Sequence, residues 1–318
     1  MDSSETKLVS VVIPCYNQAR FLGDAIESVL GQSYENFEVI VVDDGSTDET
    51  REVAGRYARV ECVSQENGGL AEARNAGLRA SRGEYIVFLD ADDRLMEKAL
   101  EAGVESLESH PSCAFVYGRY KLIAADGSEI PSDERAVVET DHYIALLRGN
   151  PIGMHATVTY RRSVLESVGG FDARRKACED YDLYLRITRN FSVKNHPAVV
   201  AEYRQHEANM SRDHKLMMET SLSVLRSQWK LVKRNQRETE AYKEGIKFWR
   251  DYCARGLIKQ ARRSLTAKNR NQAVRSLLAL LRYHPREVLM RGSRKLTRKL
   301  AASSQALLSR FVHMHDKT

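Results

Sequence analysis

The sequence predicts an α/β protein with a mostly parallel sheet flanked by helices, followed by an all-helical, basic C-terminal extension. Three observations predict this fold class. Strand-like apolar runs alternate with helical segments over the first 214 residues, the connections between them are short, and every segment beyond residue 215 has helical character. Alternation with short connections favours parallel strands joined by right-handed crossovers. We therefore expect two domains, at residues 1–214 and 215–318.

Apolar runs and turn residues define the first four strands and the helices between them. Strands are predicted at residues 8–14, 37–42, 60–63 and 85–89, of which the first and the last are buried. Helices are predicted between them at residues 21–30, 48–57 and 70–80. Pro14 ends the first strand because proline cannot donate to a sheet ladder.

The later elements follow from the same patterns. In chain order they are a helix at 95–109, a strand at 114–123, a helix at 141–148, a strand at 156–160, a helix at 181–188 and a strand at 198–203. Pro111 ends the first of these connections, and Asp126-Gly127 forms a turn. Beyond them we expect a helical hairpin at 241–285, with its turn at 269–271, and a basic amphipathic helix at 289–311.

The charge is distributed unevenly along the chain. Residues 1–214 carry 24 Lys and Arg against 36 Asp and Glu, whereas residues 215–318 carry 25 against 7. The asymmetry marks the domain boundary near residue 215 and gives the C-terminal part a physical role of its own.

Composition and missing motifs exclude several classes of protein. The polar, acidic residues 1–6 predict no secretory signal, and no apolar run approaches the roughly 18 residues of a membrane span. The five scattered cysteines lack metal-ligand spacing, so reduced thiols in the cytoplasm are expected. There is no P-loop, no G-x-G-x-x-G after the first strand and no G-x-S-x-G, which argues against an NTPase of that class, a dinucleotide enzyme and a serine hydrolase.

Two strands run directly into acidic residues. The run at 39–42 is followed by Asp43 and Asp44, and the run at 85–88 leads into the cluster at 90–93. Crowded carboxylates repel one another unless something positive binds them, and a divalent cation bridging a phosphate is the natural candidate. A structural interpretation stays open beside this one: Asp93 suits a helix cap, and Asp43-Asp44-Gly45 suits a tight turn.

An ordered series of motifs resembles glycosyltransferase family 2. The segments that carry the resemblance are residues 11–17, 41–48, 67–75, 88–93, 169–172, 179–183 and 203–206. Together they extend over roughly residues 8–212. The resemblance implies a GT-A-type, Rossmann-like fold in the first domain, which would be the catalytic domain, and transfer of a sugar from a nucleotide-sugar with inversion at the anomeric carbon.

The resemblance also implies a metal site. Asp92, in the DxD motif formed by Asp90 and Asp92, is the expected metal-coordinating carboxylate, and His206 resembles the family's late metal-binding histidine. Imidazole binds Mn²⁺ or Mg²⁺ only alongside oxygen ligands, which Asp92 supplies. A divalent cation there would offset the charge on the departing diphosphate.

The remaining donor residues come from the resemblance in the same way. Asp90 is expected to contact the ribose or the sugar, while Asp43 and Asp44 read the nucleoside, because a carboxylate can accept the imide N–H of uracil or a ribose hydroxyl.

Three more donor-side residues lie outside the acidic clusters. Pro14 and Tyr16 are expected to line the base and the ribose, and Arg74 suits the base or the pyrophosphate. The alternatives are a packed aromatic for Tyr16 and a solvated helix face for Arg74.

Glu179 and Asp180 form the expected base site. By resemblance Asp180 takes the proton from the acceptor hydroxyl, while Glu179 orients the acceptor or the loop. His155 is expected near the acceptor, although packing explains it equally well. The alternative for Glu179 and Asp180 is the acidic first turn of a helix.

Three interpretations fit the basic helical extension: an interfacial helix on an anionic membrane, a helix that docks on the acidic first domain, and a dimerising segment. We favour the membrane. Nucleic acid is disfavoured because aromatic residues do not interleave with the basic ones.

The sequence thus predicts a cytoplasmic, metal-dependent inverting glycosyltransferase, peripheral to the inner membrane face. Its donor would be a nucleotide-sugar, with UDP favoured by prevalence in the family, and its acceptor a hydroxyl of a glycan or a lipid-linked molecule in cell-surface polysaccharide synthesis. Two alternatives remain: a non-catalytic nucleotide-sugar-binding scaffold, and a nucleotidyltransferase, which would release pyrophosphate.

Overall fold

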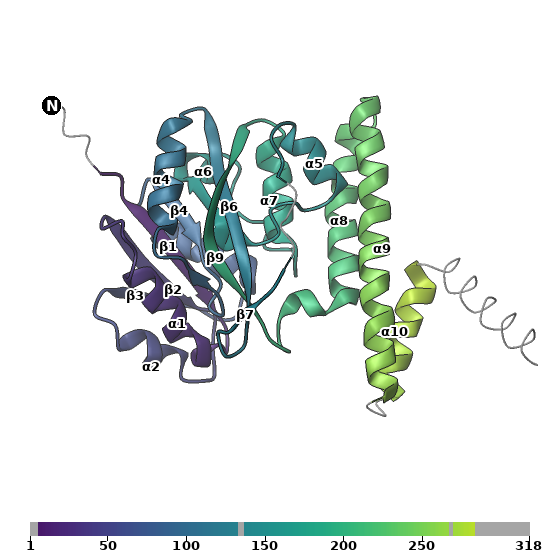
Figure 1. The fold of residues 1–318 in the computed structure, drawn as a ribbon, viewed down its shortest axis with the longest axis horizontal. Coiled ribbons are helices and arrows are strands. Elements are labelled where there is room, and N and C mark those ends of the chain that lie inside the picture. The colour runs from purple at the N-terminus through teal and green to yellow at the C-terminus, as the bar shows by residue number, and fades with distance from the viewer. Residues whose placement is uncertain (1–5, 133–136, 267–269, 284–318) are drawn as a thin grey trace, which may run out of the picture. The chain divides into compact units, whose positions relative to one another are not determined.

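The computed structural model describes residues 6–132, 137–266 and 270–283 (Figure 1). The chain divides into two compact units, Met1–Phe248 and Trp249–Thr318. The change from mixed α/β elements to helices alone falls at His214, where the helix α8 begins. The helix expected at 289–311 and part of the hairpin turn at 269–271 lie outside the described residues.

The first unit contains a nine-stranded mixed sheet with helices on both faces (Figure 1). The strands are β1 (Val9–Cys15), β2 (Phe37–Asp43), β3 (Val60–Ser64), β4 (Tyr85–Phe88), β5 (Arg94–Leu95), β6 (Cys113–Ala124), β7 (Glu129–Ile130), β8 (Val158–Arg161) and β9 (Ser192–Gln205). Their order is β3-β2-β1-β4-β8-β6-β9-β5, with β7 paired to β6.

The described helices are α1 (Ala19–Leu30), α2 (Thr50–Gly55), α3 (Leu70–Ala80), α4 (Ala99–Ser109), α5 (His142–Arg148), α6 (Arg162–Ser167), α7 (Glu179–Thr188), α8 (His214–Val232), α9 (Gln236–Thr266) and α10 (Arg270–Tyr283). Short 3₁₀ turns cover His155–Thr157 and Met210–Arg212. None of the helices in the described part of the chain combines the length and the apolar character needed to cross a bilayer.

The strands β1 to β4 form the parallel half of the sheet. β1 pairs in parallel with β2 and β4, and β2 with β3. In this register Cys15 lies opposite Asp43, so β1 and β2 end at the same edge. β8 runs antiparallel to both β4 and β6, which makes the sheet mixed beyond β4. Ligands of open α/β sheets bind at the edge formed by the carboxyl ends of the parallel strands, and the acidic residues lie there.

The core explains why β1 and β4 are almost entirely apolar, whereas β3 at the sheet edge is largely exposed. All residues of β1 are buried, because helices cover both faces of the sheet. Val11 and Ile13 belong to a core cluster with residues of α1 and α4, whereas Val12 faces α3 on the other side. Gly77 of α3 makes that approach possible, since a Cβ there would lie 2.1 Å from Val12 Cγ1.

Most predicted elements are confirmed. The prediction that Pro14 ends the first strand is wrong, since β1 continues to Cys15 with Pro14 opposite Val42, and the two-residue strand β7 was not predicted. The other main differences are as follows. Residues 94–95 form the strand β5, paired with Ala201 and Glu202 of β9, so the helix predicted from residue 95 begins at Ala99. The predicted strand at 156–160 begins as a 3₁₀ turn and becomes β8 only at Val158. The helix α6 was not predicted because it is a single short turn. β9 begins at Ser192 because its polar first half pairs with β6.

Candidate active site

Arg74 brings three distant motifs together. Its Nη2 donates a hydrogen bond to Asp90 Oδ1 over 2.6 Å, and its Nη1 donates a short hydrogen bond to Glu179 Oε1. Arg74 comes from α3, Asp90 follows β4, and Glu179 is the first residue of α7. The side chain of Arg74 is only 2% exposed. The interpretation of Arg74 as part of a solvated helix face is therefore wrong, because both ends of its guanidinium are held by carboxylates.

The carboxylates around Arg74 set the protonation states of this cluster. Burial alone would lower the pKa of Arg74, but the charges of Asp90, Glu179 and Asp180 raise it, so the guanidinium stays charged. Burial raises the pKa of Glu179 to about 7, against the lowering effect of Arg74 and with a further raising effect from Asp180. Glu179 is therefore poised to change its charge near neutral pH.

Asp180 is the more accessible member of the acidic pair. Glu179 is 3% exposed, whereas Asp180 is partly exposed. Burial also raises the pKa of Asp180, and Arg74 lowers it. The preceding residue, Cys178, has φ 60°, a left-handed conformation that is unusual for a residue with a side chain. This strained backbone sits at the start of α7, and no sequence signal indicated it.

Asp92 and His206 meet at the same edge of the sheet. His206 Nε2 lies 2.8 Å from Asp92 Oδ2, and the two residues are far apart in the chain. Burial and Asp90 raise the pKa of Asp92, while His206 lowers it. Two ligand atoms on adjacent corners of an octahedral cation, each about 2.1 Å from it, are about 3 Å apart. The 2.8 Å separation is that of a hydrogen bond, and it brings the two residues close enough to become ligands of one divalent cation.

The described residues contain no group of three or more His, Cys, Asp or Glu side chains arranged to hold a metal. A cation at Asp92 and His206 would thus have two protein ligands, and its other positions would be open to phosphate oxygens and water, as is usual for Mg²⁺.

His206 carries a proton on the nitrogen that faces Asp92. The Ala208 backbone N–H donates to His206 Nδ1 over 3.2 Å, and Arg20 Nη2 lies 3.4 Å from the same atom. Nδ1 is therefore an acceptor, and Nε2 must hold the proton of the neutral ring and donate it to Asp92. Binding of a cation by Nε2 would require the neutral ring to carry its proton on Nδ1 instead, which would break the hydrogen bond from the Ala208 backbone N–H. Arg20 was not among the predicted site residues, and its only sequence signal is its place in the first turn of α1.

Asp93 and Arg204 brace the metal-facing loop. Asp93 Oδ1 accepts a hydrogen bond from the Arg204 backbone N–H over 2.8 Å, and Arg204 Nε donates to the Asp92 carbonyl over 2.8 Å. Arg204 Nη2 also pairs with Asp24 Oδ2 at 2.7 Å. The interpretation of Asp93 as a helix cap is wrong, because β5 intervenes and Lys98 is the N-cap of α4.

Asp44 is fully engaged by the loop before α3. Its two carboxylate oxygens accept hydrogen bonds from the backbone N–H groups of Gly68, at 2.8 Å, and Gly69, at 2.9 Å, and from Gln65 Nε2 at 2.7 Å. The tight-turn interpretation applies to Asp43, which accepts from Ser46, whereas Asp44 holds the separate loop at 65–69, and its role in reading a nucleoside stays a prediction.

Asp43 is held in a similar way. It accepts from the Ser46 backbone N–H at 2.8 Å and from Arg51 Nε at 2.7 Å. Burial would raise the pKa of Asp43, but these hydrogen bonds outweigh it and lower the pKa. Asp43 is therefore ionised, and its nucleoside role also stays a prediction.

The remaining predicted residues differ in accessibility. Tyr16 is 50% exposed directly after β1, so the interpretation of a packed aromatic is wrong. Pro14 is buried within β1. His155 is 4% exposed and lies among aromatic rings, with Nε2 2.9 Å from the Tyr160 hydroxyl. Burial and Arg74 lower the pKa of His155 well below its usual value. His155 thus lies behind the site, and packing describes its surroundings.

Comparisons with known proteins agree with this arrangement. The model of "Glycosyl transferase family 2" matches residues 10–169. The "Putative teichuronic acid biosynthesis glycosyltransferase TuaG" of Bacillus subtilis is 40% identical over 128 residues, which are 39% of this chain and 50% of that protein. The chain therefore spans about half the length of this curated relative.

Solved structures confirm the fold. S. aureus TarS 1–349 in complex with UDP-GlcNAc superimposes with a TM-score of 0.55 at 18% identity, covering 84% of this chain and 88% of that one. The mannosyltransferase PcManGT of Pyrobaculum calidifontis, in complex with GDP-Man and Mn²⁺, gives a TM-score of 0.60 at 20% identity, covering 92% and 81%. The predicted GT-A-type fold class is thereby confirmed. With a matching family model over half its length and the family's motifs gathered at one edge of the sheet, the chain belongs to glycosyl transferase family 2.

Proposed function

We propose that this protein transfers a sugar from a nucleotide-sugar to a hydroxyl of a glycan or lipid-linked acceptor in polysaccharide synthesis, with inversion at the anomeric carbon and with a divalent cation. The observation that carries the proposal is the buried guanidinium of Arg74, which ties the DxD residue Asp90 to Glu179, the neighbour of the proposed base. Arg74 pairs with both Asp90, which we assign to the donor side, and Glu179, which we assign to the acceptor side.

In the proposed reaction the acceptor oxygen attacks the anomeric carbon and forms the new glycosidic bond. The bond from that carbon to the diphosphate oxygen breaks, and the nucleoside diphosphate leaves. Asp180 accepts the proton of the acceptor hydroxyl, and its partial exposure at the start of α7 leaves it accessible for this role. Glu179 holds the loop through Arg74, while Asp90 faces the donor.

The cation would be held by Asp92 and His206, whose facing atoms are 2.8 Å apart. When bound, a divalent cation neutralises the charge that develops on the departing diphosphate. Mn²⁺ in the PcManGT structure supports a cation of this kind, although that structure resembles this chain only in fold.

The donor nucleotide would bind near Tyr16, Asp43 and Asp44, where the loops after β1 and β2 lie beside each other. UDP is the first candidate, since TarS was solved with UDP-GlcNAc. GDP is the second, because PcManGT was solved with GDP-Man. The teichuronic acid name of the Bacillus relative supports a polysaccharide as the product. We place the protein at the cytoplasmic face of the membrane, with the basic extension 215–318 attracted to anionic lipids.

The experiment that tests the proposal has two stages. Thermal unfolding is measured with UDP, GDP, dTDP and CMP, each with and without Mn²⁺, for wild type and Asp92→Ala. A ligand at about 100 times its Kd adds about 2.7 kcal/mol to the free energy of unfolding. We expect one nucleotide to stabilise the wild type only with Mn²⁺, and the effect to be lost in Asp92→Ala.

The second stage measures release of nucleoside diphosphate from the matching nucleotide-sugars. Slow release with water as acceptor, accelerated by added glycan, would support a transferase. Absence of nucleotide binding and of release would contradict the proposal, and release of pyrophosphate from a nucleoside triphosphate would replace it with nucleotidyl transfer.

A further inference from the structure

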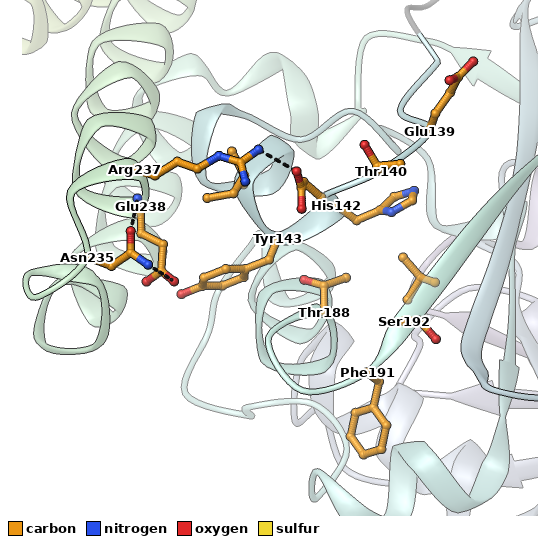
Figure 2. A pocket seen from close by; sticks show the side chains of 13 residues that line it. Glu139, Thr140, His142, Tyr143, Thr188, Phe191, Ser192, Asn235, Arg237 and Glu238 are labelled. Carbon is orange, nitrogen blue, oxygen red and sulfur yellow. Dashed lines mark hydrogen bonds and ion pairs between the residues drawn. The ribbon is translucent and has the colours of Figure 1, made fainter.

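A cavity of about 450 Å³ lies in the first unit, away from the residues of the candidate active site (Figure 2). Its walls come from three segments: residues 139–144 around the start of α5, residues 188–193 from the end of α7 to β9, and residues 235–238 at the start of α9. None of the predicted site residues lines it. The volume is in the range of small-ligand pockets, about 300–1,000 Å³.

The charges around the cavity nearly balance. Glu139, Asp141 and Glu238 contribute carboxylates and Arg237 a guanidinium to the walls, while the positive charges of Arg189 and Lys194 act on Tyr143 and His142. Arg237 Nη2 is already paired with Asp141 Oδ2 at 2.5 Å (Figure 2). Burial lowers the pKa of His142, so this ring adds no positive charge at neutral pH. Because neither sign of charge dominates, an uncharged polar ligand suits these walls better than a charged one.

The side chains of the cavity suit the two kinds of surface on a sugar. Phe191 is 38% exposed, and with Tyr143 it offers aromatic surface for the apolar C–H groups of a pyranose ring. The Thr140 hydroxyl offers a donor and an acceptor for the sugar hydroxyls, and the Thr188 hydroxyl, which donates to the Tyr184 carbonyl, offers an acceptor. The Tyr143 hydroxyl donates to Gln228 Oε1 over 3.2 Å, which fixes the direction of this ring.

One wall residue is held in a strained conformation. Asp141 has φ 54°, in the left-handed region that residues with a side chain seldom adopt. Such a conformation costs on the order of 1–3 kcal/mol and persists where the surroundings enforce it, often at ligand sites. Here the ion pair with Arg237 holds Asp141, so the start of α5 and the start of α9 are tied together along the cavity.

We propose that this cavity binds an uncharged saccharide unit of the acceptor glycan, at a second site distinct from the site of transfer. α7 connects the two: Asp180 lies in its first turn and Thr188 at its end, which is about 12 Å at 1.5 Å per residue. The inference rests on the proposed function, because it assigns to the cavity the same polymer whose hydroxyl would reach Asp180. Binding here would keep the growing chain on the protein between transfers.

The test uses the full chain and three disaccharides: cellobiose, diacetylchitobiose and the anionic digalacturonate. Binding is measured by saturation-transfer-difference NMR and titration for wild type, Phe191→Ala, Trp229→Ala and Asp180→Asn. Trp229 is the matched control, since it is an aromatic with 41% exposure that does not line the cavity. Thermal unfolding of each variant checks that the fold is intact.

We expect a neutral disaccharide to bind the wild type and to bind about tenfold more weakly to Phe191→Ala, with no change in Trp229→Ala or Asp180→Asn. The inference is overturned if no neutral disaccharide binds, if Phe191→Ala binds as the wild type does, if Asp180→Asn abolishes binding, or if digalacturonate binds more tightly than the neutral sugars. Nucleoside diphosphate release by the wild type is measured in parallel. Transfer without saccharide binding at the cavity overturns this inference alone, whereas saccharide binding without transfer overturns the proposed function.

Discussion

The imidazole of His206 faces the carboxylate of Asp92 with its protonated nitrogen, because its other nitrogen already accepts a hydrogen bond from the Ala208 backbone N–H. In the metal-free protein a long-range ¹⁵N–¹H spectrum should therefore show the Nε2–H tautomer. Addition of Mg²⁺ with the bound nucleotide should move the proton from Nε2 to Nδ1, which frees Nε2 as a ligand and breaks the hydrogen bond from Ala208. His110 is an internal control with the opposite tautomer, since its Nδ1 lies 2.8 Å from the Ser106 carbonyl oxygen. An unchanged His206 spectrum after nucleotide binding would show that His206 is not a ligand.

Replacement of Arg74 should destabilise the protein and disconnect the two halves of the site. Arg74→Ala leaves Asp90 and Glu179 without their partner, and loss of one member of a buried ion pair typically costs about 3–5 kcal/mol. Arg74→Lys should lose less stability but still lose activity, because an ammonium cannot hold both carboxylates in the same geometry. Urea unfolding and nucleoside diphosphate release measure the two effects.

The matched control for Arg74 is Arg79→Ala, on the same helix. Arg79 also pairs with a carboxylate, that of Glu72, but its side chain is 62% exposed, so its loss should change the free energy of unfolding by less than about 0.5 kcal/mol. Equal effects of Arg74→Ala and Arg79→Ala would contradict the buried role of Arg74.

Asp180→Asn should reduce transfer by about 10²–10⁴-fold, the usual contribution of a general base. The nucleotide-induced rise in melting temperature should remain, since Asp180 is placed on the acceptor side. The comparison of rate and donor binding in one variant separates loss of the base from loss of the fold. Near-normal turnover in Asp180→Asn would mean that another group takes the proton.

Glu179 should make the protein less stable as the pH rises. Burial raises its pKa from 4.5 to about 7, so the folded protein holds this proton more tightly than the unfolded chain does. The free energy of unfolding should therefore fall between about pH 4.5 and pH 7, by up to about 3 kcal/mol from this group. Urea unfolding of wild type and Glu179→Gln across that range measures the difference. Curves that run parallel at all pH values would show that the carboxyl is not perturbed.

The contact between α3 and β1 provides a prediction about packing. Gly77→Ala should cost about 1–3 kcal/mol, because the new Cβ would lie 2.1 Å from Val12 Cγ1. Gly55→Ala is the control, since a Cβ at that position meets nothing within 4 Å. Thermal unfolding of both variants should give a lower melting temperature for Gly77→Ala alone.

The periodic parts of the fold could be predicted from the sequence because they depend on local pattern. Continuous apolar runs gave the four parallel strands, and the helices between them followed from spacing. The strand β5 could not be found in this way, since Arg94–Leu95 acquires strand geometry only by pairing with the distant Ala201 and Glu202. The alternative of a helix cap at Asp93 is wrong for the same reason, since β5 lies between Asp93 and α4.

In the candidate site, too, the local motifs could be predicted from the sequence but the contacts between them could not. The motifs that hold Asp90, Asp92, Asp180 and His206 were visible in the sequence, yet their partners were not. The bond from Arg74 to Glu179 joins residues on separate helices, and only the folded chain brings them into contact. Arg20 carried no motif at all, and its approach to His206 depends on how α1 meets the loop after β9.

The guanidinium shared by Asp90 and Glu179 also links proton binding to donor binding. A donor that changes the field at Asp90 must alter the proton affinity of Glu179 through Arg74, and thermodynamic reciprocity requires protonation of Glu179 to alter donor affinity by the same factor. The release or uptake of a fraction of a proton should then accompany nucleotide-sugar binding near neutral pH. Through this one buried charge, donor binding at Asp90 and protonation of Glu179 each change the free energy of the other.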